Sequence, residues 1–516
     1  MKPLTAYTEY AEAISHFSAD KLWDLFDGDR QSLNIAHECI DRHAGDDNTA
    51  VIIVRKDADD QVLSFQQIAE DSSRFAHWLI SQGVQKGDRV AIMLEPNRAF
   101  YATLFGAIKA GAIAVPLFTL FGPDGVKLRV DDCKPKILVT NAEKLDAVAD
   151  VQGTQIVLAE AHFLEEIAVL PTTFQCSTSS QDMAMYQYTS GTTRELPEAV
   201  KHTHKALVTL MVAALYGTGL RPGDRFFCPS SPAWGHGLWH GTLAPLALGL
   251  TIGAFAGRFD AETLLDALER HRFTNLSAAA THYRMMKNVP SPCPRHFSIL
   301  KLSFTGEPID PSTEAFVLQT FHTPACSMYG TTEIGVILVS YPGASDFEVR
   351  PGSLGKPIPG AEVAVLDEND QPCKPGQTGE IKVMRRGYWI ATKDLGRTDS
   401  DGYFYHGGRA DDVIISAGWT MSAVEIENAV LKHSDVLEAA AIGVPDEKRG
   451  QVVRAYVVSA RAASESFTEE IQQLVRNSLA QHEYPRQVEF VDSLPKTPAG
   501  KIHRKKLRDA ALAQHY

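Results

Sequence analysis

The chain has 516 residues, 44% of them hydrophobic, and a formal net charge of -13 at pH 7. This length exceeds the size at which one hydrophobic core stops growing, so we expect at least two domains. The negative charge argues against a general nucleic-acid binder, because a polyanionic partner would be repelled over most of the surface.

Cysteine usage and the apolar runs indicate a cytoplasmic protein without a membrane span. The seven cysteines are Cys39, Cys133, Cys176, Cys228, Cys293, Cys326 and Cys373. Their odd number and wide spacing are typical of reduced thiols. The first twenty residues carry charges and lack a continuous apolar core, so we expect no signal peptide. The most apolar run, 106–121, is short and contains Lys109, which favours a helix followed by a strand.

Residues 63–170 alternate between helical and strand patterns. We expect helices at 65–82 and 99–109 and strands at 89–94, 112–117 and 137–140. Strands rich in Val and Ile that alternate with helices are typical of parallel sheets covered on both faces. The sequence therefore predicts an α/β architecture.

A hydroxyl-rich turn follows a predicted strand at 183–187 and precedes a predicted apolar helix at 205–215. It comprises Thr189, Ser190, Gly191, Thr192 and Thr193. Hydroxyl and backbone N–H donors around a glycine, between a strand and a helix, suit a polyphosphate. An ordinary Ser/Thr turn has the same composition.

Four motifs occur in order along the chain. They are YTSGTT at 188–193, MYGTTE at 328–333, DGYFYHGGRADD at 401–412 and PKTPAGKIHR at 495–504. In this order and spacing the chain resembles the adenylate-forming (ANL) superfamily over nearly its whole length, and within it the short- to medium-chain acyl-CoA synthetases. The resemblance implies an AMP-forming, ATP-dependent acid:CoA ligase. It also implies a large N-terminal AMP-binding domain of stacked α/β sheets with a β-rich subdomain, 1–410, and a small mobile α+β C-terminal domain, 411–516.

Residues at the ends of predicted strands form the implied nucleotide site. Strands at 302–305 and 326–329 end in small or polar residues, where ligands of open α/β sheets collect. A carboxylate suits a vicinal diol because it accepts two hydrogen bonds at once. The resemblance implies that Gly306, Glu307 and Pro308 line the adenine, that Tyr329 stacks on it, and that Asp394 and Arg409 hold the ribose.

The same resemblance places the reacting phosphate and its cations. Thr332 is implied to contact the α-phosphate and Glu333 to hold Mg²⁺, a hard ion that prefers carboxylate and phosphate oxygens. Without the motif, a lone Glu at a strand end reads as a solvated surface residue. Lys501, at the tip of a loop extended by prolines, is implied to be the catalytic ammonium, although the basic stretch around it also suits a solvated terminus.

The segment 234–241 is too rich in Gly and aromatic residues for a plain element. In the family this position opens onto the acid-binding tunnel, which makes Trp234 and His236 candidate pocket residues; tryptophans are equally common as core anchors. Gly330 occupies the position where acetate-specific relatives carry a tryptophan. The pocket is therefore expected to accept acids larger than acetate, of short to medium chain or aryl.

The C-terminal part is predicted to contain helices at 423–432 and 469–480 and strands at 439–444 and 452–458. By resemblance it swings about Asp411 and, in its second orientation, presents Gly418 so that the pantetheine of CoA can pass. The family's phosphate-loop lysine is replaced here by Glu198. Either this carboxylate points away from the phosphates, or Arg194 replaces the lost charge; we favour the second.

Two other functions remain open from the sequence. The enzyme could load the thiol of a carrier protein, or the chain could be a non-catalytic nucleotide-binding member. The implied partners of the ligase are a carboxylic acid, ATP, Mg²⁺ and CoA, in small-organic-acid or fatty-acid metabolism. Neither nucleic acid nor membrane is expected as a partner, and a homodimer is compatible with the family.

Overall fold

The computed structural model describes residues 2–45, 48–188, 199–290, 295–331, 334–409, 414–416, 419–446, 449–479, 484–496 and 502–513. By its internal contacts the chain divides into two compact units. The first contains Met1–Ser303, Tyr341–Phe347 and Ile358–Gly360, and the second contains Phe304–Ser340, Glu348–Pro357 and Ala361–Tyr516. The domain boundary predicted at 410/411 falls outside the described residues and stays a prediction.

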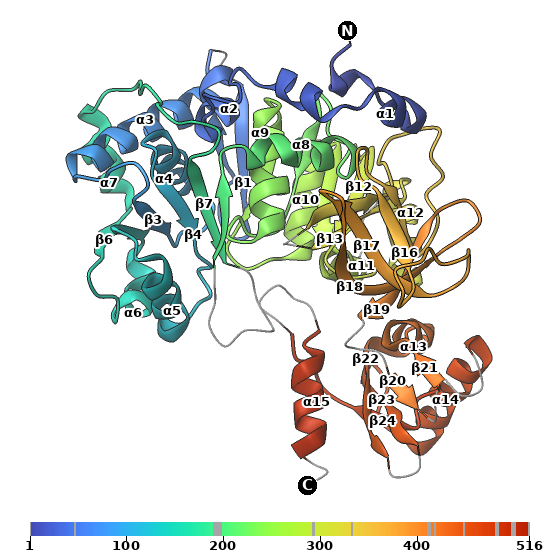
Figure 1. The fold of residues 1–516 in the computed structure, drawn as a ribbon. Helices are drawn as coiled ribbons and strands as arrows, with labels where there is room; N and C mark the ends of the chain where they lie inside the picture. Colours follow the sequence, from blue (N-terminus) through green and yellow to red (C-terminus); the bar gives the residue numbers. More distant parts are fainter. Residues whose placement is uncertain are drawn as a thin grey trace. The chain divides into compact units, whose positions relative to one another are not determined.

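The first unit contains two sheets, each formed mainly by parallel strands (Figure 1). One has the order β6 (Gln155–Leu158), β5 (Ile137–Thr140), β3 (Arg89–Ile92), β4 (Ile113–Pro116), β7 (Met183–Tyr188) and β8 (Ala199–Thr203). The other runs β11 (Asn275–Ala279), β9 (Arg225–Phe227), β10 (Thr251–Ala256), β1 (Thr49–Arg55) and β2 (Gln61–Ser64). Only β8 and β2 pair antiparallel among these described strands. The predicted parallel α/β architecture is therefore confirmed.

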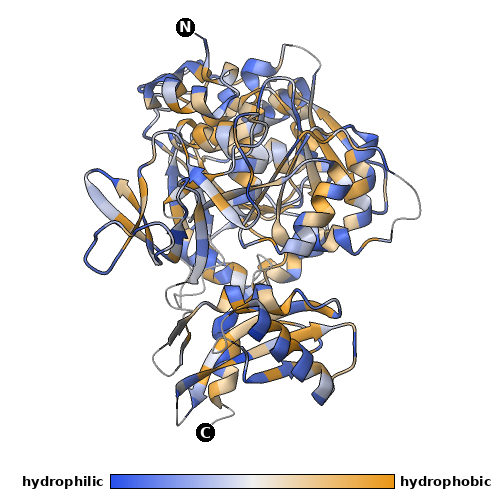
Figure 2. Cartoon of the chain, turned by 90° about the vertical axis from the view of Figure 1, so that its right-hand side faces the viewer, coloured by the Kyte–Doolittle hydropathy of each residue, from blue (hydrophilic) through white to orange (hydrophobic). Residues whose placement is uncertain are grey.

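The helices of the first unit cover these sheets. They are α1 (Tyr10–His16), α2 (Ile35–Cys39), α3 (Phe65–Ser81), α4 (Arg98–Lys109), α5 (Pro123–Cys133), α6 (Leu145–Val148), α7 (Ala161–Glu166), α8 (Ala206–Tyr216), α9 (Ala244–Ala247), α10 (Ala261–Arg270) and α11 (Ala280–Lys287). Apolar residues concentrate on the strands and on the helix faces turned toward them (Figure 2). Helix α4 is buried on every side, as expected for a helix that is apolar all round. Lys109 is buried within it and pairs with Asp41 at 2.6 Å.

The structure corrects one local prediction. The hydroxyl-rich segment was expected to lead from a strand into a helix, but the next described element is strand β8, which pairs antiparallel with β7. Helix α8 begins only after β8. In the chain the segment therefore stands between two paired strands and not between a strand and a helix.

The second unit begins within β12 (Lys301–Thr305) and continues through α12 (Pro311–Phe321). Its larger sheet has the order β16 (Val363–Leu366), β17 (Gly379–Arg385), β18 (Tyr388–Thr398), β19 (Phe404–Arg409), β15 (Ser353–Pro357), β14 (Gly335–Val339) and β13 (Ala325–Thr331). Neighbouring strands in this series pair antiparallel. The β-rich subdomain implied by the resemblance is confirmed.

The C-terminal part of the second unit is an α+β layer. Its elements are β20 (Ile414–Ser416), β21 (Trp419–Met421), α13 (Ala423–Val430), β22 (Val436–Asp446), β23 (Gly450–Ser459), α14 (Glu465–Ser478), β24 (Gln487–Phe490) and α15 (Arg504–Ala513). Helices α13 and α14 share one apolar cluster with β22 and β23, and α15 shares another with the alternate residues of the same strands. Helix α14 begins earlier than predicted because the Ser464 hydroxyl accepts the Phe467 N–H as an N-cap.

The structure bears on two sequence predictions, one about membrane spans and one about the cysteines. Among the described residues, none of the helices combines the length and the apolarity needed to traverse a bilayer. The six cysteines in the described part of the chain are all unpaired, as expected for reduced thiols.

The buried carboxylate of Glu38 gives a test of the packing. It accepts hydrogen bonds from Asp27 N and Gly28 N and pairs with Arg42 Nη1 at 2.9 Å. We expect Glu38→Gln to lower the free energy of unfolding by about 3 kcal/mol in urea titrations, because the guanidinium loses its buried counter-charge. The exposed i,i+4 pair Lys127 and Asp131 is the control: Asp131→Asn should leave the urea midpoint unchanged. Equal midpoints for both variants would contradict this assignment.

Candidate functional site

Many residues predicted for the site lie outside the described part of the chain. These are Thr189, Ser190, Gly191, Thr192, Thr193, Arg194, Glu198, Thr332, Glu333, Asp411, Gly418 and Lys501. Among the described residues, no group of three or more His, Cys, Asp and Glu side chains is arranged to hold a metal ion. The roles of these residues stay predictions.

In the second unit, the structure brings together three residues predicted to bind the nucleoside. The Tyr329 hydroxyl donates a 2.6 Å hydrogen bond to Asp394 Oδ2. Arg409 lies directly opposite Asp394 in the β18–β19 ladder. His406 Nε2 lies 3.8 Å from Asp394 Oδ1. The Asp394 side chain is only 8% exposed, so its orientation is fixed by these neighbours.

Two other segments predicted to lie at the nucleotide or acid site have a backbone geometry that requires glycine, at Gly306 and at Gly330. Gly306 follows β12 with a φ of +97°, a conformation that favours glycine, and it is followed by Glu307 and Pro308. A Cβ on Gly330 would lie 2.1 Å from the carbonyl oxygen of Gly335, across the β13–β14 pair. Any side chain at position 330 therefore requires β14 to move.

In the first unit, the Gly- and aromatic-rich segment forms a π-helix over His236–Leu243. Its glycines permit close packing: a Cβ on Gly237 would lie 2.2 Å from the Ser231 carbonyl oxygen, and one on Gly241 would lie 2.9 Å from Cys228 Cβ. The π-helix is rare and is often found at functional sites. The sequence indicated an irregular element here but gave no sign of its type.

His236 is buried and hydrogen bonded through both ring nitrogens. Nδ1 lies 3.1 Å from Ser230 Oγ, and Nε2 lies 2.9 Å from Ser277 Oγ, which in turn accepts a hydrogen bond from Ser303. Burial and the neighbouring His240 and His282 lower the pKa of His236 well below its usual value. The imidazole is therefore neutral near pH 7, with its polar atoms occupied by serine hydroxyls.

Cys228 lies beside the same imidazole, with Sγ 3.8 Å from His236 Nδ1. Burial raises the pKa of this thiol to about 12. A protonated thiol next to a neutral imidazole lacks the thiolate that nucleophilic catalysis requires. Cys228 is consequently not a candidate nucleophile.

Two tryptophans of the same segment, Trp234 and Trp239, make aromatic contacts near His236. The ring of Trp234 meets that of His236 edge-on at 6.0 Å, and Trp234 itself is half-buried. Trp239 donates from Nε1 to Gln187 Oε1 at 2.8 Å and lies 4.7 Å from the ring of His202. Gln187 and His202 come from β7 and β8, the two strands that flank the hydroxyl-rich segment.

Sequence reasoning missed the partners of His236. Ser277 and Ser303 lie on β11 and β12 and resemble ordinary strand residues in the sequence. The half-buried His202 and His240 were likewise not singled out from the sequence. Only the close spacing of Gly235, Gly237 and Gly241 indicates that the backbone packs tightly at this place.

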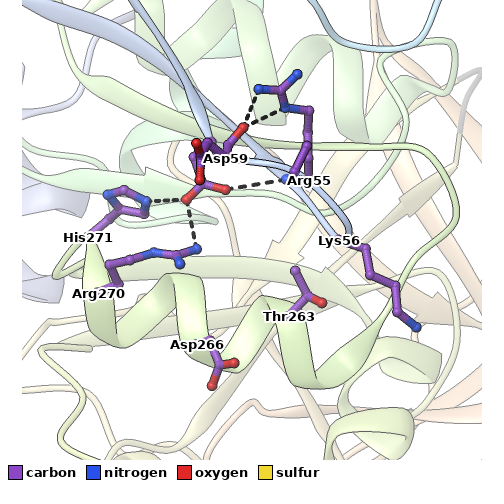
Figure 3. A pocket seen from close by; sticks show the side chains of 9 residues that line it. Arg55, Lys56, Asp59, Thr263, Asp266, Arg270 and His271 are labelled. Atoms are coloured by element: carbon purple, nitrogen blue, oxygen red, sulfur yellow. Dashed lines mark hydrogen bonds and ion pairs between the residues drawn. The ribbon is translucent and has the colours of Figure 1, made fainter.

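A polar depression of about 380 Å³ lies elsewhere in the first unit, between the β1–β2 turn and α10 (Figure 3). Its charged groups are already paired: Asp60 Oδ2 contacts Arg270 at 2.7 Å and His271 at 2.6 Å, and Lys56 contacts Asp260 at 2.7 Å. None of the predicted site residues lines it.

Comparison with known proteins gives consistent matches over the chain. A family model described as "AMP-binding enzyme" matches residues 40–391, and one described as "AMP-binding enzyme C-terminal domain" matches residues 425–501. The chain is 31% identical to an acetyl-coenzyme A synthetase of Bacillus subtilis (strain 168), with 97% of this chain and 94% of the relative covered.

Two solved structures extend this likeness to three dimensions. An acyl-CoA synthetase of Brucella canis is 30% identical, with a TM-score of 0.74, and the match covers 99% of this chain and 100% of that one. An anthranilate CoA ligase, AuaEII, in complex with anthranoyl-AMP is 25% identical, with a TM-score of 0.86, and the match covers 97% and 100% of the two chains.

Two half-buried histidines of the first unit predict how the stability of the protein depends on pH. Burial lowers the pKa of His202 and of His240 to about 4. Between pH 6.5 and 4 the unfolded chain binds these protons and the folded chain does not, so stability is complete above pH 6.5 and is lost as the pH falls. We expect His240→Gln to reduce the slope of unfolding free energy by about 1.4 kcal/mol per pH unit over this range. Identical slopes in urea titrations at pH 5 to 6.5 would contradict the lowered pKa.

Proposed function

Because the chain belongs to the family of AMP-binding enzymes, and within it to the AMP-forming acid–CoA ligases, we propose that it activates a carboxylic acid larger than acetate. The enzyme adenylates the acid with ATP and transfers the acyl group to the thiol of CoA. The observation that carries this function is the match of both family models together with relatives of 30% and 31% identity over nearly the whole chain.

The first half-reaction joins two anions, the carboxylate and the α-phosphate of ATP. We propose that Lys501 supplies the ammonium that offsets their repulsion and that Thr332 contacts the α-phosphate. Carboxylate and phosphate oxygens are the ligands Mg²⁺ prefers, so Glu333 together with the ATP phosphates is a fitting donor set for that ion. When bound, Mg²⁺ would supply positive charge beside the phosphates.

The hydroxyl-rich segment is proposed to bind the remaining phosphates. Thr189, Ser190, Gly191, Thr192 and Thr193 offer hydroxyl and backbone N–H donors at positions that follow β7 in the chain. Since a glutamate occupies the family's lysine position at 198, the guanidinium of Arg194 is the proposed replacement charge.

The nucleoside is proposed to bind beside the Tyr329–Asp394 hydrogen bond. Asp394 accepts this bond through Oδ2, and a carboxylate can accept several hydrogen bonds at once, because each of its oxygens has two lone pairs. A pre-oriented carboxylate can then receive the ribose hydroxyls without first losing rotational freedom. Gly306, Glu307 and Pro308 are proposed to line the adenine, and Arg409 to contact the ribose.

The residues around His236 favour a substrate acid whose tail carries no charge. The imidazole is neutral, and its nitrogens are already hydrogen bonded to Ser230 and Ser277. A second carboxylate on the substrate would meet no positive charge from this histidine, and burying an unpaired charge is costly. Together with Trp234 and the glycine at 330, this favours aliphatic or aryl monocarboxylic acids.

The second half-reaction requires a new arrangement of the C-terminal part. We propose a domain boundary at 410/411, supported by the gap between the two family models at 391 and 425. Asp411 is the proposed hinge, and Gly418 the residue that lets the pantetheine of CoA pass. A cytoplasmic location is proposed from the free cysteines, and a homodimer remains compatible with the family.

The function is tested by measuring AMP release with ATP, Mg²⁺ and a panel that contains acetate, aliphatic acids from C3 to C12, aryl acids and dicarboxylic acids. We expect AMP with CoA as acceptor, with aliphatic or aryl monocarboxylic acids preferred over acetate and over dicarboxylic acids. A phosphopantetheinylated carrier protein used in place of CoA is the comparison. Turnover with the carrier alone would overturn the CoA assignment, and a preference for acetate or a dicarboxylic acid would overturn the proposed acid class.

Lys501→Ala separates the two half-reactions. We expect acid-dependent ATP–pyrophosphate exchange to fall by roughly 100-fold to 1,000-fold, since a preorganised charge is lost from the adenylation step. Conversion of supplied acyl-AMP and CoA to thioester should persist, because the lysine leaves the site before that step. An equal loss in both assays would contradict the domain-swing account.

A further inference from the structure

The segments on either side of the Lys501 loop are joined to each other. Lys496 and Ile502 form an isolated antiparallel bridge, and His503 N donates to the Pro495 carbonyl at 2.8 Å. The two described segments that flank positions 497–501 in the chain are therefore paired with each other. We therefore expect the contacts that fix these two segments to determine the position of the Lys501 loop.

A buried ion pair fixes the segment that follows the loop. Arg504, the first residue of α15, donates from Nε to Glu427 Oε1 at 3.0 Å and from Nη2 to Glu427 Oε2 at 2.6 Å. Glu427 lies on α13, and its side chain is 8% exposed. Its Oε1 also accepts the backbone N–H of Ala441, in the middle of β22, at 2.8 Å. The carboxylate therefore ties α15, α13 and β22 to one point.

The two residues of this ion pair come from helices that pack in two different apolar clusters. Glu427 belongs to the helix that packs on Ala439 and Ala441 of β22, whereas α15 packs through Leu507 on the alternate residues of that strand. Apolar contacts hold α15 against the sheet but are non-directional, so they allow the helix to slide or rotate. A two-point guanidinium–carboxylate contact fixes direction as well as distance.

The segment that precedes the loop has a weaker anchor. Lys496 Nζ contacts Glu438 Oε2 at 2.7 Å, but both side chains are about one-third exposed. Exposed pairs of this kind contribute little to stability. The directional constraint on the loop therefore comes mainly from Arg504.

We propose that Glu427 and Arg504 are positioning residues for adenylation: their ion pair sets the start of α15 and thereby the place where Lys501 is presented. This inference rests on the proposed role of Lys501. Arg504 is three positions after Lys501, so their Cα atoms are at most about 11 Å apart along the chain. A small rotation of α15 is consequently passed on to the ammonium, and misplacement by about 1 Å can reduce a rate by roughly 100-fold.

Measuring the two half-reactions separately distinguishes a positioning role of the ion pair from a role in the stability of the C-terminal part alone. Adenylation uses Lys501, whereas thioester formation proceeds after the lysine has left. Loss of the ion pair should therefore slow the first step selectively. A general weakening of the C-terminal fold would instead slow both steps, since both use this part of the chain.

The test compares Arg504→Gln, Arg504→Lys and Glu427→Gln in the full-length protein, with Lys505→Gln as the matched control. Lys505 is the next basic residue of α15 and is exposed. We expect acid-dependent ATP–pyrophosphate exchange to fall roughly 10-fold to 100-fold in Arg504→Gln and Glu427→Gln. Arg504→Lys, which keeps the charge but loses the two-point contact, should fall between these variants and the wild type. Thioester formation from supplied acyl-AMP should stay within about twofold of wild type in every variant, because that step does not use the lysine.

Two results would overturn the positioning role. One is parallel loss of both half-reactions with a lowered melting temperature, and the other is unchanged exchange in Arg504→Gln. Lys501→Ala, assayed in parallel, separates this inference from its premise. If Lys501→Ala loses exchange while Arg504→Gln keeps it, only the positioning role fails; if Lys501→Ala keeps exchange, the lysine assignment fails and the positioning role with it.

Discussion

Repulsion between a carboxylate and a triphosphate is the constraint on which this site depends. Two unit negative charges about 4 Å apart repel by roughly 4 kcal/mol near a protein surface. The chain itself carries a net charge of -13, so positive charge has to be concentrated at the site. The proposed sources are Lys501, Arg194 and a Mg²⁺ ion on Glu333. They differ in kind, because only the lysine belongs to a segment proposed to move between the two steps.

The described polar groups share one property: their orientation is fixed before any substrate binds. Asp394 is held by Tyr329, and His236 is held between Ser230 and Ser277. Arg504 is held by Glu427 in the same way. Preorganised groups of this kind lose little freedom when the reacting atoms arrive, so their full effect acts on the transition state. Two of these residues also have different proposed roles. The neutral His236 is proposed to lie beside the acid, and the carboxylate of Asp394 is proposed to accept hydrogen bonds from the ribose.

The sequence predicted the elements whose pattern is periodic. Helix α3 and strands β3, β4 and β5 were predicted almost to the residue, since their apolar residues follow helical or strand spacing. Strand β8 was missed because its five residues are too short for a period and follow a turn that suggested a helix start. The π-helix was missed because glycine spacing reports close packing without specifying the turn. The contacts of His236 with Ser277 and of Tyr329 with Asp394 join residues far apart in sequence, and single-sequence patterns carry no information on such pairs.

In the proposed reaction the carboxylate attacks the α-phosphate of ATP, so that one oxygen of the acid becomes the bridge of an acyl-adenylate. The most direct measurement uses an acid labelled with oxygen-18 in its carboxylate, turned over with ATP and CoA, followed by mass spectrometry of the products. When the thiolate displaces AMP, the bridging oxygen leaves with the phosphate, so the account predicts one labelled oxygen in each AMP and none in pyrophosphate. Unlabelled AMP, or label in inorganic phosphate or pyrophosphate, would contradict it.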